Sequence, residues 1–160
     1  MQRKFRLGVS ASAMVLGVAV TTFGAAGSAN AAGYETNYAG VTSDGAAQCA
    51  YQLTYPGSGL GWVCFEKYGD ILWVTRSFYE DSQTSMRWVN QLKNSSGSWV
   101  DYRSGECINN LGESTWGVCN KDFYENSSLN ALGGYGSRIA YKACTTTSCS
   151  ALSPWVYNDG

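Results

Sequence analysis

The sequence predicts an all-β protein, a single antiparallel β-sandwich or barrel of about seven to eight short strands that is stapled by disulfides. Three observations lead to this fold class. Short segments of alternating apolar and polar residues recur along residues 48–160, glycine and asparagine turns separate them, and six cysteines lie among them. Outside the N-terminal segment, no window carries the sustained i, i+3, i+4, i+7 apolar stripe of a helix.

The N-terminal residues 1–31 have the three-part pattern of a secretory signal peptide. Basic residues at positions 3, 4 and 6 precede an apolar run at 7–20, and Ala29-Asn30-Ala31 matches the small-x-small cleavage pattern. The apolar run is shorter than the roughly 20 residues that a bilayer span requires. We therefore expect a secreted, extracellular product that begins at Ala32.

Residues 32–47 form a small-residue and polar stretch with scattered tyrosines, which we interpret as an extended N-terminal arm ahead of the β domain. Such an arm is either a frayed terminus or a segment that becomes ordered as a strand on a partner. Its candidate partner-binding residues would project on roughly alternating faces, with a break near 39–40. They are Tyr34, Thr36, Tyr38 and Val41.

The β domain at 48–160 is predicted to consist of strands separated by turn residues. Alternation with period two begins at Cys49, and turn segments such as Pro56-Gly57-Ser58-Gly59 and Tyr68-Gly69-Asp70 interrupt it. The expected strands are 49–55, 60–65, 71–74, 86–90, 98–102, 115–119, 138–144 and 155–157.

An even number of cysteines in a secreted chain predicts three disulfides, for which fifteen pairings exist. Pairing of sequence neighbours is the simplest hypothesis, because each bridge would tie the two arms of a local hairpin. Zinc is disfavoured, since the sequence has no CxxC pair and no histidine. The neighbour pairs are Cys49–Cys64, Cys107–Cys119 and Cys144–Cys149.

Catalysis has little support in the sequence. Without histidine there is no Ser–His triad, and oxidised cysteines leave no thiolate nucleophile. Carboxylate pairs remain, but they lie beside turn signals, where acidic residues usually face water. We therefore expect a non-catalytic protein with no cofactor and no metal. The pairs are Glu66–Asp70, Glu80–Asp81, Asp101–Glu106 and Asp122–Glu125.

Charge and aromatic residues narrow the choice of partners. After signal removal, eight Lys and Arg remain against twelve Asp and Glu, a net charge of −4, which argues against nucleic acid and anionic membranes. Six tryptophans fall roughly one per predicted strand, and we expect at least two-thirds of them in the core. Exposed aromatics are most expected at 78–81, where they suit a sugar-stacking platform or a protein-contact loop.

From about residue 60 to 150 the chain resembles short exported proteins of Streptomyces-type actinobacteria. The residues that carry the resemblance are Gly69-Asp70 with the following ILWV, Ser104-Gly105-Glu106-Cys107, Gly117-Val118-Cys119-Asn120 with Phe123 and Glu125, Ala143-Cys144 and Cys149-Ser150. Within that group, the chain is similar to the small adaptor subunit of umbrella toxin particles.

This resemblance implies a compact β domain that joins a large secreted toxin subunit to a lectin-like subunit. It also implies that residues 32–47 insert into repeats of the large subunit.

An inhibitor of a secreted hydrolase is the alternative function, with 94–97 or 144–149 as the presented loop. A carbohydrate-binding module comes third, and an enzyme that relies on carboxylates comes last.

Overall fold

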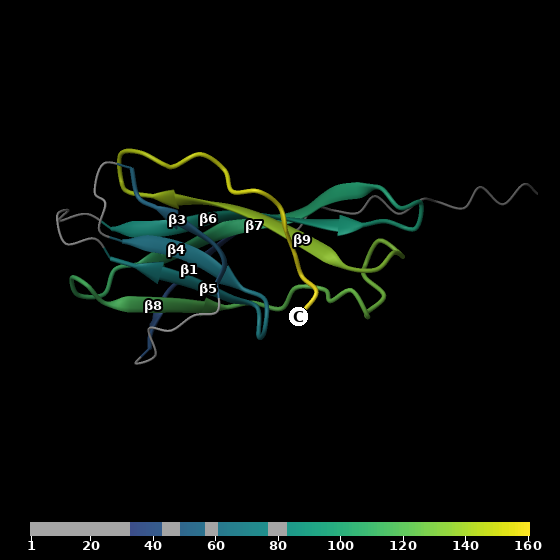
Figure 1. Ribbon diagram of the computed structural model, residues 1–160, viewed down its shortest axis with the longest axis horizontal. Helices are drawn as coiled ribbons and strands as arrows, with labels where there is room; N and C mark the ends of the chain where they lie inside the picture. The colour runs from purple at the N-terminus through teal and green to yellow at the C-terminus, as the bar shows by residue number, and fades with distance from the viewer. Residues whose placement is uncertain (1–32, 43–48, 57–60, 77–82) are drawn as a thin grey trace, which may run out of the picture.

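A computed structural model of the chain describes residues 33–42, 49–56, 61–76 and 83–160, which form two five-stranded sheets packed face to face (Figure 1). The first sheet has the strand order β1-β7-β6-β9-β10, and the second has the order β2-β8-β5-β4-β3. Neither sheet closes on itself within these residues, so the sandwich form of the predicted fold class is confirmed. The strands are β1 (Tyr34–Tyr38), β2 (Gly40–Val41), β3 (Cys49–Thr54), β4 (Trp62–Glu66), β5 (Ile71–Thr75), β6 (Thr84–Lys93), β7 (Trp99–Asn109), β8 (Trp116–Asn120), β9 (Ser137–Cys144) and β10 (Val156–Tyr157).

The strands differ from the expected set at the N-terminus and in the longest hairpin. The described part of the chain has ten strands, because part of the expected arm forms β1 and β2 at the edges of the two sheets. β1 pairs with β7 in parallel, whereas the other strand pairs are antiparallel. β6 and β7 extend beyond the predicted segments, because polar residues on their outer side continue the same alternation. The predicted signal peptide lies outside the described residues.

The core between the sheets is built by this alternation. In β4, Val63 and Phe65 face inward, while Trp62 and Glu66 are half-buried on the opposite side. Each large apolar side chain that leaves water here contributes about 1.5–3 kcal/mol to stability. The core cluster contains Ala39, Tyr55, Val63, Phe65, Leu72, Val74, Met86, Trp88, Cys107, Cys119, Phe123, Ile139, Tyr141, Ala143 and Val156.

The three disulfides have the neighbour pairing that the sequence favours. Cys49–Cys64 joins β3 to β4 within the second sheet. Cys107–Cys119 joins β7 to β8 and therefore links the two sheets through the core. Cys144–Cys149 closes the loop that follows β9. This prediction is confirmed, and three disulfides in a small β protein are consistent with an extracellular location.

The C-terminal segment runs along β9 and ties the end of the chain to the turn between β4 and β5 (Figure 1). The Ser153 amide donates to the Tyr141 carbonyl over 2.9 Å, and the Asn158 amide donates to the Ser137 carbonyl over 3.0 Å. The buried Asn158 side chain then donates to a carboxylate oxygen of Asp70 over 2.9 Å. This contact joins parts of the chain that are 88 residues apart.

The bridge between the sheets should contribute more to stability than the short bridge Cys144–Cys149. Replacing Cys107 and Cys119 by alanine should lower the free energy of unfolding by about 3 kcal/mol, because the unfolded chain gains freedom and the core loses packed sulfur. The matched control replaces Cys144 and Cys149, whose loop spans 5 residues against 12, and should lose about 1–2 kcal/mol. Urea unfolding followed by tryptophan fluorescence measures both, and equal losses would contradict the prediction.

Candidate partner-binding surface

Residues 34–41 are extended, as expected of the arm, but they lie on their own domain. β1 follows the outer edge of the first sheet, and β2 pairs with β8 at the edge of the second sheet. Ala39 lies between the two strands, is buried in the core and donates its amide to the Ile108 carbonyl over 2.8 Å. The chain therefore crosses from one sheet to the other at Ala39.

The four predicted arm residues do not alternate between faces. Tyr34, Thr36 and Tyr38 share the outer side of the first sheet, because side chains two residues apart on a strand point the same way. Tyr34 and Tyr38 are 58% and 64% exposed. Val41, which is 72% exposed, lies on β2 at the other sheet. The structure thus groups three of the four residues in one row and separates the fourth.

The inward side chains of β1 hold the strand in place. A Glu35 carboxylate oxygen lies 2.8 Å from the Lys121 ammonium, and the other lies 3.3 Å from Nε of Arg103. The Lys121 ammonium also donates to the Asn37 side chain and lies 5.0 Å from the ring centre of Trp88. The Lys121 side chain is only 5% exposed, so its charge depends on this carboxylate for compensation.

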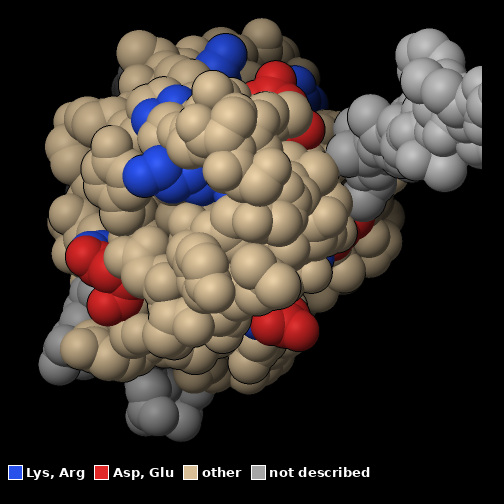
Figure 2. Space-filling view, turned by 90° about the vertical axis from the view of Figure 1, so that its right-hand side faces the viewer, with Lys and Arg blue, Asp and Glu red and all other residues tan. Residues whose placement is uncertain are grey.

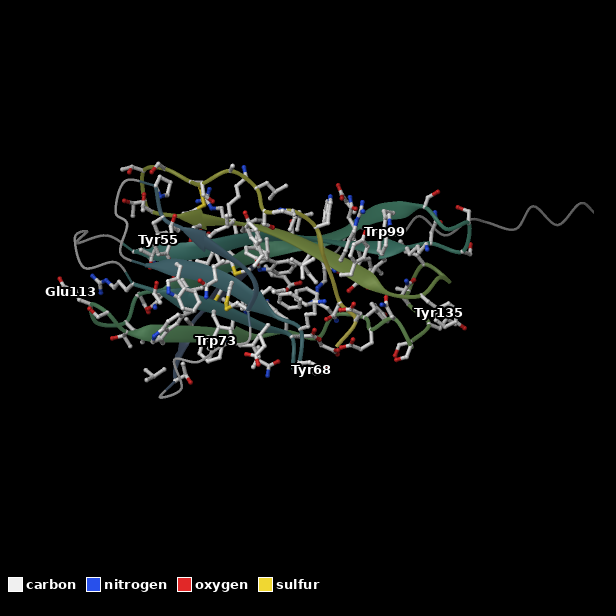
Figure 3. All side chains as sticks on the ribbon, viewed as in Figure 1. Tyr55, Tyr68, Trp73, Trp99, Glu113 and Tyr135 are labelled. Atoms are coloured by element: carbon white, nitrogen blue, oxygen red, sulfur yellow. A yellow bond between two sulfur atoms is a disulfide. The ribbon has the colours of Figure 1, made fainter. Side chains whose placement is uncertain are left out.

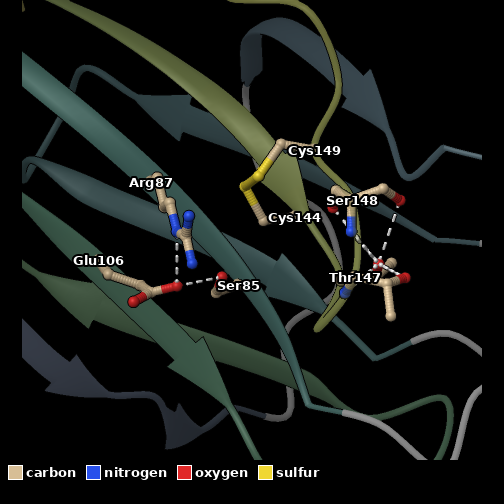
Figure 4. Close-up of polar contacts among 8 residues, drawn as sticks. Ser85, Arg87, Glu106, Cys144, Thr147, Ser148 and Cys149 are labelled. Atoms are coloured by element: carbon tan, nitrogen blue, oxygen red, sulfur yellow. Dashed lines mark hydrogen bonds and ion pairs between the residues drawn. A yellow bond between two sulfur atoms is a disulfide. The ribbon is translucent and has the colours of Figure 1, made fainter.

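On the outer side, Glu106 of β7 lies between Thr36 of β1 and Arg87 of β6 in the strand register, and Figure 4 shows its contacts with β6. Its carboxylate accepts a hydrogen bond from the Ser85 hydroxyl over 2.6 Å and one from Nε of Arg87 over 3.1 Å. Burial, and then the neighbouring Glu106 carboxylate, raise the pKa of the Tyr34 hydroxyl. Tyr34 is therefore the end of a polar row that runs across three strands.

Beyond Arg87 the same row enters a shallow hollow of about 210 Å³. Lys142 lies directly across from Arg87 in the register of β6 and β9. Within the described part of the chain, Lys142 has no ion pair or hydrogen bond, whereas Arg87 has Glu106. The hollow thus combines an apolar lining with one uncompensated cation. Its lining residues are Arg87, Trp88, Val89, Lys142 and Leu152.

Fewer tryptophans lie in the core than the sequence predicts. Trp88 alone belongs to the core cluster, and Trp73 is buried on the outer side of the second sheet (Figure 3). Trp73 donates its indole N–H to Glu66 over 2.7 Å. The other four tryptophans are half-buried, because period-two alternation sends them to the outer sides of the sheets. The expectation that two-thirds would be core is wrong.

These outer tryptophans pack against protein groups. The rings of Trp62 and Trp116 are 4.0 Å apart at an interplanar angle of 70°, and Trp116 contacts Trp73 in the same edge-to-face manner. Such a cluster does not present coplanar rings for sugar stacking. On the first sheet, the Arg138 guanidinium lies 4.5 Å from the ring centre of Trp99 and 4.4 Å from that of Trp155. The predicted exposed aromatics at 78–81 lie outside the described residues.

The end of the sandwich at the β6–β7 hairpin, where Trp99 and Tyr135 lie, carries few charged side chains (Figures 2 and 3). Tyr135 is 58% exposed there, which is as much as Tyr34. It lies in the loop between β8 and β9, away from the row formed by β1. Exposed tyrosines therefore occur on several parts of the surface, since Tyr51, Tyr68 and Tyr157 are exposed as well, and the row of β1 is the one that places two of them on the same side of one strand.

Several carboxylates of the acidic pairs considered from the sequence have structural partners, but a carboxylate oxygen of Glu125 is buried without a hydrogen-bond partner and Asp122 lines a separate hollow. Asp101 accepts from the Gln91 side chain over 2.6 Å, whereas Glu106 accepts from Ser85 and Arg87. Asp70 is buried, and its carboxylate accepts from the Phe123 amide over 2.8 Å as well as from Asn158. Glu80–Asp81 lies outside the described residues. Among the residues that are described, no group of three acidic or cysteine side chains is placed to hold a metal ion.

Comparison with protein-family models, with curated proteins and with solved structures gives no match. The described residues contain no helix that is long and apolar enough to cross a membrane. Sequence analysis identified Tyr34, Thr36 and Tyr38 but missed Arg87 and Lys142, because only strand register brings those two together.

Loss of the Glu35 carboxylate should loosen β1. Glu35→Gln leaves the buried Lys121 ammonium without its counter-charge, so we expect the free energy of unfolding to fall by about 1–3 kcal/mol. The double variant Glu35→Gln/Lys121→Met should recover part of the loss, because both charges are then gone. Thr36→Val on the outer side is the control and should change stability by less than about 0.5 kcal/mol. Chemical denaturation that gives equal stabilities for Glu35→Gln and the wild type would refute this role.

Asp70 should make stability depend on pH. Burial raises the pKa of its carboxyl to about 6, since the charged form is poorly solvated. Its stabilising contribution is thus complete below the unfolded-state pKa near 4 and is lost as pH rises through 6. Between pH 4 and pH 7.5, the wild type should lose about 2 kcal/mol relative to Asp70→Asn. Urea titrations at several pH values test this, and parallel pH profiles for the two proteins would contradict it.

Proposed function

We propose that the protein is a secreted, non-catalytic protein-binding module that contacts its partner through the outer side of β1 and the adjoining row of the first sheet. One observation carries the proposal. A locked edge strand presents Tyr34, Thr36 and Tyr38 in a single exposed row. Tyrosine suits such a surface, because it offers a large contact area and a hydroxyl at a low cost in conformational entropy.

The composition of the adjoining surface supports a protein partner. The row from Tyr34 passes through Glu106 and Arg87 to the hollow beside Lys142, so apolar and charged groups alternate over a short distance. Interfaces between proteins combine aromatic anchors with a polar rim in this way. The uncompensated Lys142 favours an acidic group of the partner next to an apolar side chain.

The non-catalytic part of the proposal rests on the carboxylates. Glu66 accepts from Trp73, Asp101 accepts from Gln91, and Asp70 anchors the C-terminal segment. Each of these three groups has a structural task in the fold, which supports a binding role over catalysis by these carboxylates.

An adaptor of an extracellular toxin complex is the specific form of the proposal. The signal-like N-terminus and the three disulfides support secretion. The resemblance to umbrella toxin adaptors supplies the partners, a large secreted toxin subunit and a lectin-like subunit. The mature net charge of −4 is consistent with protein partners in place of nucleic acid or membrane.

Inhibition of a secreted hydrolase is the second candidate, and the loop closed by Cys144–Cys149 favours it. The Thr145 hydroxyl accepts from the Thr147 and Ser148 amides over 3.3 and 3.2 Å, while residues 146–149 are exposed. A loop that is cross-linked and internally hydrogen-bonded loses little entropy on binding. Assays of a panel of secreted proteases and amylases with the pure protein distinguish this candidate from the adaptor.

Removing the tyrosine row should strongly reduce partner capture. The immobilised protein should enrich a large secreted protein from culture supernatant of the producing organism, as identified by mass spectrometry. Tyr34→Ser/Tyr38→Ser should reduce that capture about tenfold or more, because the aromatic anchors of an interface carry most of its binding energy. Both side chains are exposed, so the melting temperature should stay within a few degrees.

Tyr135→Ser provides a matched control, because Tyr135 is equally exposed but lies away from β1. It should capture the partner as well as the wild type does. If the double tyrosine variant captures the same protein undiminished, the surface is assigned to the wrong side of the sandwich.

A further inference from the structure

The sequence of β1 is nearly symmetric about its centre. It reads Tyr34-Glu35-Thr36-Asn37-Tyr38, with tyrosine at both ends, threonine in the middle and an acceptor side chain on each side of it. In the part of the chain that the structure describes, no strand lies on the outer side of β1. A segment of this kind is complementary to a second copy of itself in antiparallel orientation.

The backbone of β1 has the phase that such pairing requires. Ala39 donates its amide to β7, and in a strand the backbone groups of alternate residues face the same neighbour. Glu35 and Asn37 therefore direct their N–H and C=O groups toward β7. The backbone groups of Tyr34, Thr36 and Tyr38 face the open edge, where a partner strand can bind them.

We propose that two copies of the protein pair through β1, antiparallel, about a two-fold axis at Thr36. Thr36 then lies opposite Thr36 of the second copy, and Tyr34 lies opposite its Tyr38. All three are hydrogen-bonded positions of an antiparallel ladder, so each outward N–H and C=O finds a partner. The two first sheets become one sheet of ten strands, five from each copy.

Charge selects this register over its neighbours. A two-fold axis at Glu35 would place two carboxylates directly opposite each other, which is unfavourable. With the axis at Thr36, Glu35 lies across from Asn37, whose amide is uncharged. A shift toward Asn37 shortens the ladder, because the chain leaves the first sheet at Ala39 to reach the core.

Dimer formation is independent of the proposed function. The edge of β1 is used for the second copy, while the tyrosine row points to the outer side of the sheet and stays accessible in the pair. The dimer would place two such rows side by side on one continuous surface. Partner capture and dimer formation can therefore fail separately.

The test is sedimentation equilibrium of the full secreted protein over a wide concentration range. The wild type should show a mass that rises toward twice the monomer mass. Thr36→Pro should weaken association about tenfold or more, because it removes the N–H at the two-fold axis while leaving the bonds to β7 intact. Asn37→Pro is the matched control, since it removes an N–H that faces β7, and it should lower the melting temperature.

A cysteine placed at the axis gives a second readout. The described cysteines are all paired, so Thr36→Cys adds one free thiol to each copy. In this register the Cα atoms of the two new cysteines are about 5.5 Å apart, a distance that a disulfide can bridge. Mild oxidation should give a covalent dimer for Thr36→Cys and none for Tyr34→Cys. A wild type that stays monomeric at the highest concentration, a dimer that Thr36→Pro leaves unchanged, or equal cross-linking of both cysteine variants would overturn the proposal.

Discussion

The contact between Glu35 and the Lys121 ammonium determines where the N-terminal strand β1 lies and which of its sides faces solvent. Lys121 is buried against Trp88 and cannot remain charged there at low cost without a carboxylate beside it. Because Glu35 supplies that carboxylate from the inner side of β1, the strand is held against β7 and its outer side is fixed as well. Alternate residues of one short strand thus serve two purposes. Glu35 and Asn37 anchor it, while Tyr34, Thr36 and Tyr38 face solvent.

The same division between inner and outer sides explains which aromatic side chains remain exposed to solvent. Tryptophan is abundant, yet the outer tryptophans contact one another, a carboxylate or the Arg138 guanidinium. Their surface is used within the molecule and contributes to stability. The large apolar side chains that remain exposed are chiefly tyrosines, whose hydroxyl makes exposure to water inexpensive. A surface for a partner is therefore indicated by tyrosine on an edge strand and not by the number of tryptophans.

Local sequence signals predicted much of the fold. Alternation and turn residues located the eight strands from β3 to β10, and sequence proximity gave the three disulfides, because each bridge closes a short hairpin or loop. The same reasoning missed β1 and β2. Their polar sequence buries little besides Ala39, so no hydrophobic pattern marks them as strands. It also placed Tyr34, Thr36 and Tyr38 in the candidate surface without showing that they share one side.

The sequence by itself determined that this is a cross-linked all-β chain without histidine, and that its N-terminal segment is extended and rich in tyrosine. Only the tertiary structure decided where that segment lies. Glu35 meets Lys121 across 86 residues, and Asp70 meets Asn158 across 88, so neither contact leaves a periodic trace in the chain. Local propensity reports the conformation of a segment, whereas the identity of its neighbours depends on strand order and register. For that reason the class of fold could be predicted, but the sheet edge that β1 occupies could not.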